Sequence, residues 1–121
     1  MKKFDDKRSS IAVAALLHAI DRISQHIKNV NLDDFRVNAT LQDAVYFQLS
    51  IISEKVQEID RFFLDRYDYP WYQLKTFRKL MLNEKFNIHL EAVWLMVEKD
   101  LPDLRKTLEA MQQREFSDGR K

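Results

Sequence analysis

The chain has 121 residues and a formal net charge of +1, with 45% hydrophobic and 32% charged residues. This composition is enough for one globular domain, excludes an intrinsically disordered chain and gives no global nucleic-acid signature. Cysteine is absent and no apolar run approaches the roughly 20 residues that span a bilayer. We therefore expect a single cytoplasmic domain over residues 1–121, with an ordered core at about 9–113, no disulfide and no membrane contact.

Turn-forming residues are scarce, with one glycine and two prolines. A β-rich fold of this length needs many turns, which depend on glycine, proline and asparagine. The sequence therefore predicts an all-α fold, an up-and-down bundle of four to five helices.

The first helix is predicted from Ser9 or Ser10, either of which can cap it, to about Asn29. His18 and His26 share its polar face but lie eight residues apart, whereas metal-binding pairs on helices are three or four apart. We interpret them as surface residues. The apolar positions at helical spacing are Val13, Leu16, Leu17, Ile20, Ile23 and Ile27.

A connector at 29–40 is followed by a second helix predicted from about Leu41 to Arg66, with Asn38 or Thr40 as its cap. Its near-heptad stripe consists of Leu41, Ala44, Val45, Gln48, Ile52, Val56, Ile59 and Phe63. A second apolar set comprises Phe47, Leu49 and Ile51. Two apolar faces predict contacts with two neighbours, within the chain or across a dimer.

Pro70 suits the first turn of a third helix, predicted from Trp71 to about Leu82. NEKFN at 83–87 is the next break, and a fourth helix is predicted from about Ile88. DLP at 100–102 is expected to kink this helix or to start a fifth, because proline removes a backbone donor. We expect the tail at 114–121 to be frayed.

The order of several short motifs resembles the HepT-like branch of the HEPN superfamily, small helical proteins that are often toxins of bacterial toxin–antitoxin pairs. The similarity extends over most of the chain. Its components are DAVYFQLSIISEK at 43–55, Pro70-Trp71, Arg78, Val93-Trp94 and DLPDL at 100–104. The resemblance implies metal-independent RNA cleavage without a cofactor, at a site shared across a homodimer, and control by a nucleotidyltransferase antitoxin.

The catalytic motif of that family, R-N-x-x-x-H-x-Y, is only partly kept in this chain. Arg78 matches the arginine, but Lys79 stands at the asparagine, Asn83 at the histidine and Lys85 at the tyrosine. In the family, the tyrosine can receive AMP from the partner nucleotidyltransferase. Lys85 has no phenolic oxygen, so that control is doubtful at this position.

The chemistry implied by the resemblance needs a proton-transferring group near neutral pH. Histidine fits because its pKa is about 6.5, whereas the carboxamide of Asn83 neither gains nor loses a proton. His89 lies eleven residues after Arg78, roughly 16 Å along a continuous helix, which is too far to share a phosphate. Lys85 can hold phosphate, but a reference pKa of about 10.4 makes it a poor base.

Lys75, Arg78, Lys79 and Lys85 form a basic cluster that could receive RNA, or could be a solvated charged face. Arg78 is either the phosphate contact or an arginine of the third helix that is paired with Glu54 or solvated. In helix two, the Glu54 of the family pattern is retained next to Ser53, where the family has glycine. Glu54 could support Arg78 at a buried or interface position, or lie on the surface.

Three functional hypotheses follow. The first is a HepT-like protein whose ribonuclease site has decayed, so that it keeps the fold and the homodimer but cleaves RNA poorly or not at all. The second is an active toxin that uses Arg78 with a noncanonical base. The third is a helical accessory subunit of a nucleotidyltransferase. We expect no metal and no cofactor in any of them.

Overall fold

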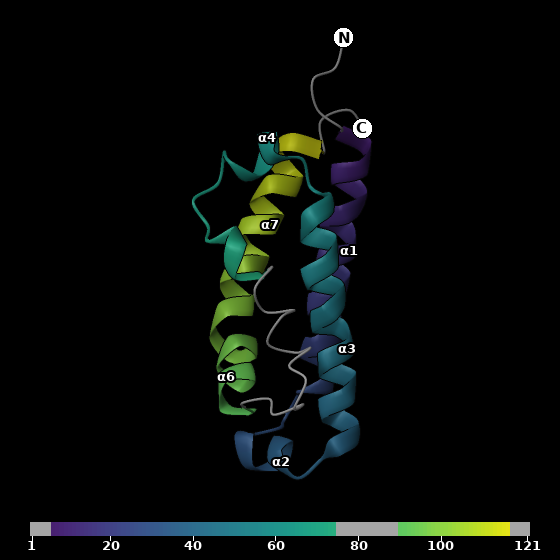
Figure 1. Cartoon of the computed structure of the whole chain (residues 1–121), viewed down its shortest axis with the longest axis vertical. Helices are drawn as coiled ribbons and strands as arrows, with labels where there is room; N and C mark the ends of the chain where they lie inside the picture. Colours follow the sequence, from purple (N-terminus) through teal and green to yellow (C-terminus); the bar gives the residue numbers. More distant parts are fainter. Residues whose placement is uncertain (1–5, 75–89, 117–121) are drawn as a thin grey trace.

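The structure, a computed structural model, describes residues 6–74 and 90–116. Within these ranges every regular element is helical, which confirms the all-α prediction, and Figure 1 shows the helices running along one long axis. The elements are α1 (Asp6–His26), α2 (Leu32–Arg36), α3 (Ala39–Lys55), η1 (Val56–Glu58), α4 (Arg61–Leu64), α6 (Leu90–Leu95), η2 (Met96–Asp100) and α7 (Leu101–Phe116). Residues 71–74 form a further helical turn.

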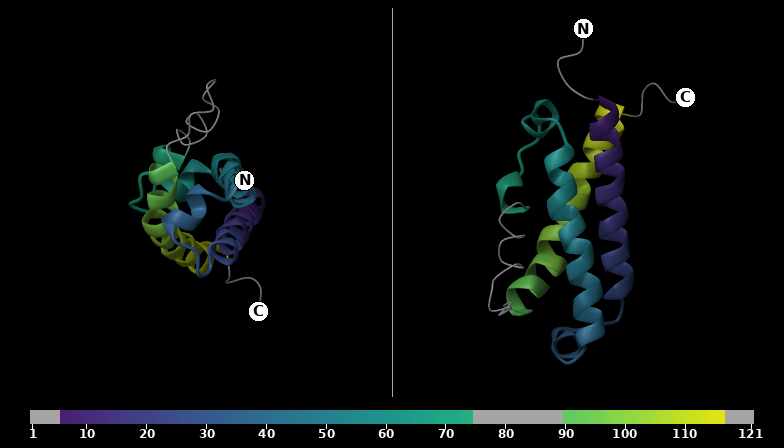
Figure 2. Two further views of the ribbon diagram at one scale, coloured as in Figure 1. Left: turned by 90° about the horizontal axis from the view of Figure 1, so that it is seen from below. Right: turned by 45° about the vertical axis from the view of Figure 1, so that its right-hand side comes forward.

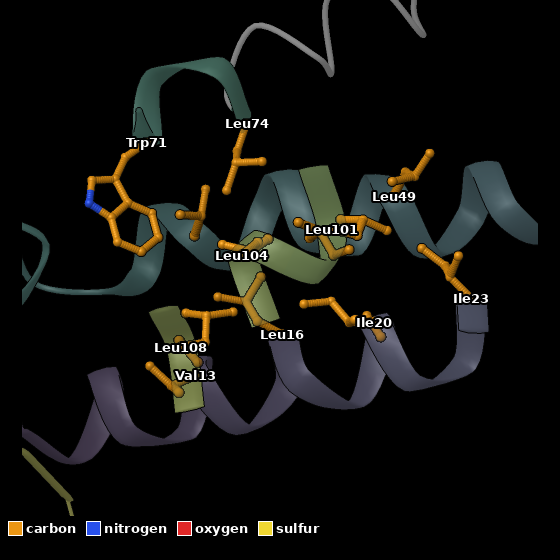
Figure 3. Close-up of a cluster of buried hydrophobic side chains, with 14 of the residues drawn as sticks. Val13, Leu16, Ile20, Ile23, Leu49, Trp71, Leu74, Leu101, Leu104 and Leu108 are labelled. Atoms are coloured by element: carbon orange, nitrogen blue, oxygen red, sulfur yellow. The ribbon is translucent and has the colours of Figure 1, made fainter. Parts of the chain in front are cut away.

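Helices α1 and α3 lie side by side and antiparallel, and α6, η2 and α7 form one bent rod beside them (Figure 2). The apolar face predicted for α1 is its buried face, with Val13, Leu16 and Ile20 at 2% exposure or less. Figure 3 shows these side chains meeting those of α3 and α7. The core therefore lies between three long rods, as the 3.6-residue spacing of apolar residues predicts.

The cap predicted for α1 is wrong, because Ser9 and Ser10 lie inside the helix. Ser9 is fully buried, and its hydroxyl accepts a hydrogen bond from the backbone N–H of Asp60 at 2.8 Å. The Ser9 hydroxyl thus accepts from a backbone N–H in a distant turn, and it does not cap the start of its own helix. Asp6 already lies in the first turn, where a negative charge is favourable.

The predicted connector at 29–40 contains the short helix α2, which was not predicted. Asn31 caps it by accepting from the N–H of Asp34 at 2.8 Å, and the Asp34 carboxylate accepts from the N–H of Asn31 in return. This capping box is the local reason for one helical turn. The helix seats the fully buried Phe35 against Trp94, with ring centroids 5.3 Å apart.

The prediction that Asn38 caps the next helix is confirmed, since its side chain accepts from the N–H of Leu41 at 3.0 Å. The predicted end at Arg66 is wrong, because α3 ends at Lys55. A 3₁₀ turn follows, then Ile59 in an extended conformation, and Asp60 caps α4 by accepting from the N–H of Phe62. The apolar spacing continued through this turn, which is why periodicity alone predicted one long helix.

At the predicted kink at 100–102, a π-helical segment, η2, ends at Asp100, two residues before Pro102. The N–H of Leu101 bonds to the carbonyl of Met96, five residues back, instead of four. Proline lacks a backbone donor and crowds the preceding turn, and both proline and a π segment bend a helix. The helical rod therefore continues through the proline without ending.

The tail was predicted to fray from residue 114, but α7 continues to Phe116. Phe116 is 3% exposed and packs edge-on against Phe63 with centroids 4.9 Å apart. Beside it, the Glu115 carboxylate accepts from Arg66 and from the hydroxyl of Tyr67. Aromatic packing and these polar contacts fix the last turn. None of the helices within 6–74 and 90–116 is long and apolar enough to cross a membrane.

Candidate functional site

The residues predicted to carry catalysis and RNA binding lie between 75 and 89, outside the residues that the structure describes. They are Lys75, Arg78, Lys79, Asn83 and Lys85. Their roles therefore stay predictions. The described chain enters this stretch at Leu74 and resumes at Leu90, so the geometry of its two ends can be given.

The entry to the stretch is held by Trp71. Its indole N–H donates to the carbonyl of Leu64 at 3.0 Å, and its ring lies 4.8 Å from the ring of Tyr69. Trp71 and Leu74 are 9% and 3% exposed, and both point into the core (Figure 3). The Pro70-Trp71 pair, which belongs to the family resemblance, therefore anchors the helical turn that leads to residue 75.

Tyr69 lies beside the π segment and the first turn of α7. Burial, and then the carboxylates of Asp100 and Asp103, raise the pKa of Tyr69 to about 12. The phenol therefore stays protonated at neutral pH and is not a general base there. Its ring packs against the ring of Trp71, which leads to residue 75.

The exit from the stretch is held by α6. Val93 and Trp94 are buried at 4% and 7% exposure, so the aliphatic–tryptophan pair of the family resemblance is part of the core. Glu91, on the outer face of α6, forms an ion pair with Arg36 of α2. Because both side chains are exposed, this pair contributes little to stability, and the aromatic contact of Phe35 with Trp94 positions the helix.

Glu54 is the one candidate site residue within the described ranges. It is exposed on α3 in the single chain, and its predicted role as a buried or interface partner of Arg78 stays a prediction. Its neighbour Ser53 is 1% exposed, and its hydroxyl has no hydrogen-bond partner. The family resemblance places glycine at this position, and the small side chain of Ser53 is almost fully covered by the rest of the protein.

Charge is distributed unevenly along the sequence. Residues 6–74 and 90–116 contain 12 Lys or Arg against 16 Asp or Glu, whereas residues 75–89 contain four against one. The described helical framework is therefore acidic, whereas residues 75–89, which carry the predicted site, have a formal net charge of +3 (four Lys or Arg against one Glu). Among the described residues no group of three His, Asp or Glu side chains is arranged to hold a metal ion.

Comparison with known proteins identifies relatives over most of the chain. The family model described as Ribonuclease HepT-like matches residues 16–111. A Methanocaldococcus jannaschii protein named "Gamma-glutamylcyclotransferase and putative RNase" is 30% identical over 77% of this chain, and this match covers 42% of that protein, less than half of its length. A Caldanaerobacter subterraneus "Putative RNase" is 24% identical over 83% of this chain and 90% of its own.

A third relative, a "Probable ribonuclease HepT" from Thermococcus cleftensis, is 25% identical over 79% of this chain and 88% of its own length. No solved structure matches this chain.

Proposed function

Because this chain belongs to the HepT-like ribonuclease family, we propose that it binds RNA through residues 75–89 and cleaves it poorly or not at all. The observation that carries the proposal is the motif at 78–85, which keeps Arg78 but has Asn83 at the position of the family histidine. Arginine offers a permanently charged planar fork for a phosphate group. The phosphate contact is retained, and the proton-transferring group is replaced.

The loss of acid–base chemistry accounts for the expected impairment. Attack of a ribose hydroxyl on phosphorus needs a proton to leave the nucleophile and another to reach the leaving oxygen. General acid–base help is typically worth about 10²–10⁴ in rate, and a carboxamide supplies none of it. Lys85, at the position of the family tyrosine, is protonated at neutral pH unless strongly perturbed, so it adds charge but no base.

The charge distribution supports RNA as the ligand. Four cations and one carboxylate within fifteen residues make a local positive region, and the acidic balance of residues 6–74 and 90–116 disfavours phosphate on the described helices. Binding that depends on these cations weakens as salt rises, because each phosphate contact releases counterions. A steep salt dependence of RNA affinity is therefore expected.

The test is cleavage and binding of a fluorescent mixed-sequence RNA pool in the absence of divalent metal. We expect little or no cleavage by the wild type, and binding that Arg78→Ala weakens. Arg61→Ala, an exposed arginine of α4, is the matched control and should leave binding unchanged. Cleavage by the wild type that Arg78→Ala abolishes would contradict the impairment and favour an active toxin with a noncanonical base.

A single reversion sharpens the test. We expect Asn83→His alone not to restore full activity, because Lys79 and Lys85 also depart from the motif. Full ribonuclease activity from that one change would show that the histidine was the sole missing group. Measuring RNA binding by Asn83→His shows whether low cleavage results from a slow chemical step or from a failure to bind RNA.

The protein is further proposed to act as a homodimer in a toxin–antitoxin pair, or as a subunit beside a nucleotidyltransferase. The large exposed side chain of Phe47, 63% accessible on α3, supports an interface on that helix. Analytical ultracentrifugation at micromolar concentration tests this part. We expect a dimer that Phe47→Asp weakens, and a clean wild-type monomer would count against a shared site.

A further inference from the structure

Tyr72 is the most exposed aromatic side chain among the described residues, with 66% of its surface accessible. It lies on the last described helical turn before residue 75, and the other side of this turn is buried. Trp71 and Leu74 both point from it into the core (Figure 3). The N–H of Gln73 donates to the carbonyl of Pro70 at 3.0 Å, which closes the turn. The backbone that carries Tyr72 is therefore held in place, while the tyrosine itself lies on the surface.

The covalent chain itself keeps Tyr72 close to the basic stretch. Consecutive Cα atoms are about 3.8 Å apart, so the Cα atoms of Tyr72 and Lys75 are at most ~11 Å apart in any conformation of the chain. The other exposed aromatic residues of the described chain, Phe47 and Phe62, have no such tie, and the guanidinium of Arg66 lies over the Phe62 ring. Tyr72 is therefore the exposed ring that lies beside the predicted RNA contacts.

The charges on the two sides of Tyr72 differ in sign. Residues 75–89 contain four Lys or Arg against one Glu, which attracts phosphate groups, whereas Asp68, four residues before Tyr72, is an exposed carboxylate that repels them. A nucleic-acid base carries no net charge and is not repelled. Proteins that bind single strands combine positive charge for the backbone with aromatic side chains on which bases stack. The surroundings of Tyr72 therefore suit a base better than a phosphate.

We propose that Tyr72 stacks on an unpaired base of the RNA that the protein binds. The inference rests on the proposed function and adds to it a binding residue that acts through its ring and not through charge. Only two side-chain torsions are fixed when a tyrosine makes such a contact, so the entropy cost is low. Every base has a π-face, so the contact adds affinity without selecting a sequence.

The test measures the affinity of the whole protein for a short fluorescein-labelled single-stranded RNA, by fluorescence anisotropy at several salt concentrations. We expect Tyr72→Ala to weaken binding about tenfold, as the loss of one stacked base allows, and Tyr72→Phe to bind like the wild type because it keeps the ring. Stacking releases no counterions, so Tyr72→Ala should leave the slope of log affinity against log salt unchanged. Arg78→Ala should reduce the size of that slope by about one.

Phe62→Ala is the matched control, because it removes an exposed ring from α4 and should leave RNA affinity unchanged. Both rings are at the surface, so folding is expected to be retained, and circular dichroism checks it. Unchanged affinity of Tyr72→Ala, an equal loss in Tyr72→Phe or Phe62→Ala, or an altered salt slope in Tyr72→Ala would overturn the stacking and leave the proposed RNA binding standing. A wild type that binds no RNA would overturn both. A weaker dimer with unchanged RNA affinity in Tyr72→Ala would assign the ring to a protein interface instead.

Discussion

Helix α1 and the connection from residue 56 to residue 74 are held in place by different interactions. In α1, one face of apolar side chains is fully buried. In the connection, the chain changes direction repeatedly, and polar side chains bond to backbone groups at each change. Ser9 accepts from the N–H of Asp60, Asp60 accepts from the N–H of Phe62, and Trp71 donates to the carbonyl of Leu64.

The difference shows what keeps an irregular segment ordered. A helix satisfies its own backbone, so apolar burial on one face is sufficient to fix it. A segment with short turns leaves backbone groups unpaired, and each of these needs a specific partner when water is excluded. Substitutions in the two regions should therefore differ in both size and kind.

The largest effect is expected from Leu16→Ala in α1. Leu16 has no exposed surface, and truncation leaves a cavity between three helices, so we expect a loss of about 2–5 kcal/mol in the free energy of unfolding. Urea denaturation followed by circular dichroism measures it. The exposed Leu95→Ala is the matched control, with an expected change of about 0.5 kcal/mol or less.

Ser9→Ala should destabilise the protein less than Leu16→Ala does, because it weakens the connection from residue 56 to residue 74 and leaves the apolar core intact. It removes the hydroxyl that accepts from the part-buried N–H of Asp60, so we expect a loss of about 1–3 kcal/mol in the free energy of unfolding. Ser10→Ala, one residue along the same helix, is the matched control and should cost much less. Hydrogen exchange of the Asp60 amide should quicken in Ser9→Ala only. Equal effects of the two substitutions would mean that the serine hydroxyl does not hold the turn.

The smallest effect is expected at high pH and concerns Tyr69. Its pKa is raised to about 12 in the folded protein from an ordinary value of 10.0. A raised pKa means that the contribution to stability is complete below pH 10 and is lost as the pH rises towards 12. In Tyr69→Phe, this part of the alkaline decline in stability should be absent. Chemical denaturation at pH 9 and pH 11 tests it, and identical declines in both proteins would contradict the assignment.

The sequence predicted those parts of the fold that depend on burial periodicity and standard caps. The all-α class, the buried face of α1 and the Asn38 cap followed from spacing and residue type. The break after Lys55 was missed because apolar spacing continued through Val56 and Ile59, and both are buried in a turn as they would be in a helix.

Other features depended on contacts that no local pattern contains. The capping box of α2 uses aspartate where glutamate or glutamine is the usual signal, and the role of Ser9 requires a residue 51 positions away. Phe116 is ordered because Phe63 lies beside it. Of the candidate site, only the exposed position of Glu54 is described, and the roles of residues 75–89 stay predictions.

The π segment sets the rotational phase between the two halves of the α6–α7 rod. A π-helical turn holds one more residue than an α-helical turn, so it acts as a single-residue insertion within a helix. If residues 96–100 took α-helical geometry with none removed, α6 would rotate by about 100° relative to α7. Trp94 would then turn away from Phe35 while Leu104 still faced α1. Deletion of one of these residues together with a return to α-helical geometry would leave the two contacts in phase, so the π segment lets the rod hold one extra residue while it keeps both contacts.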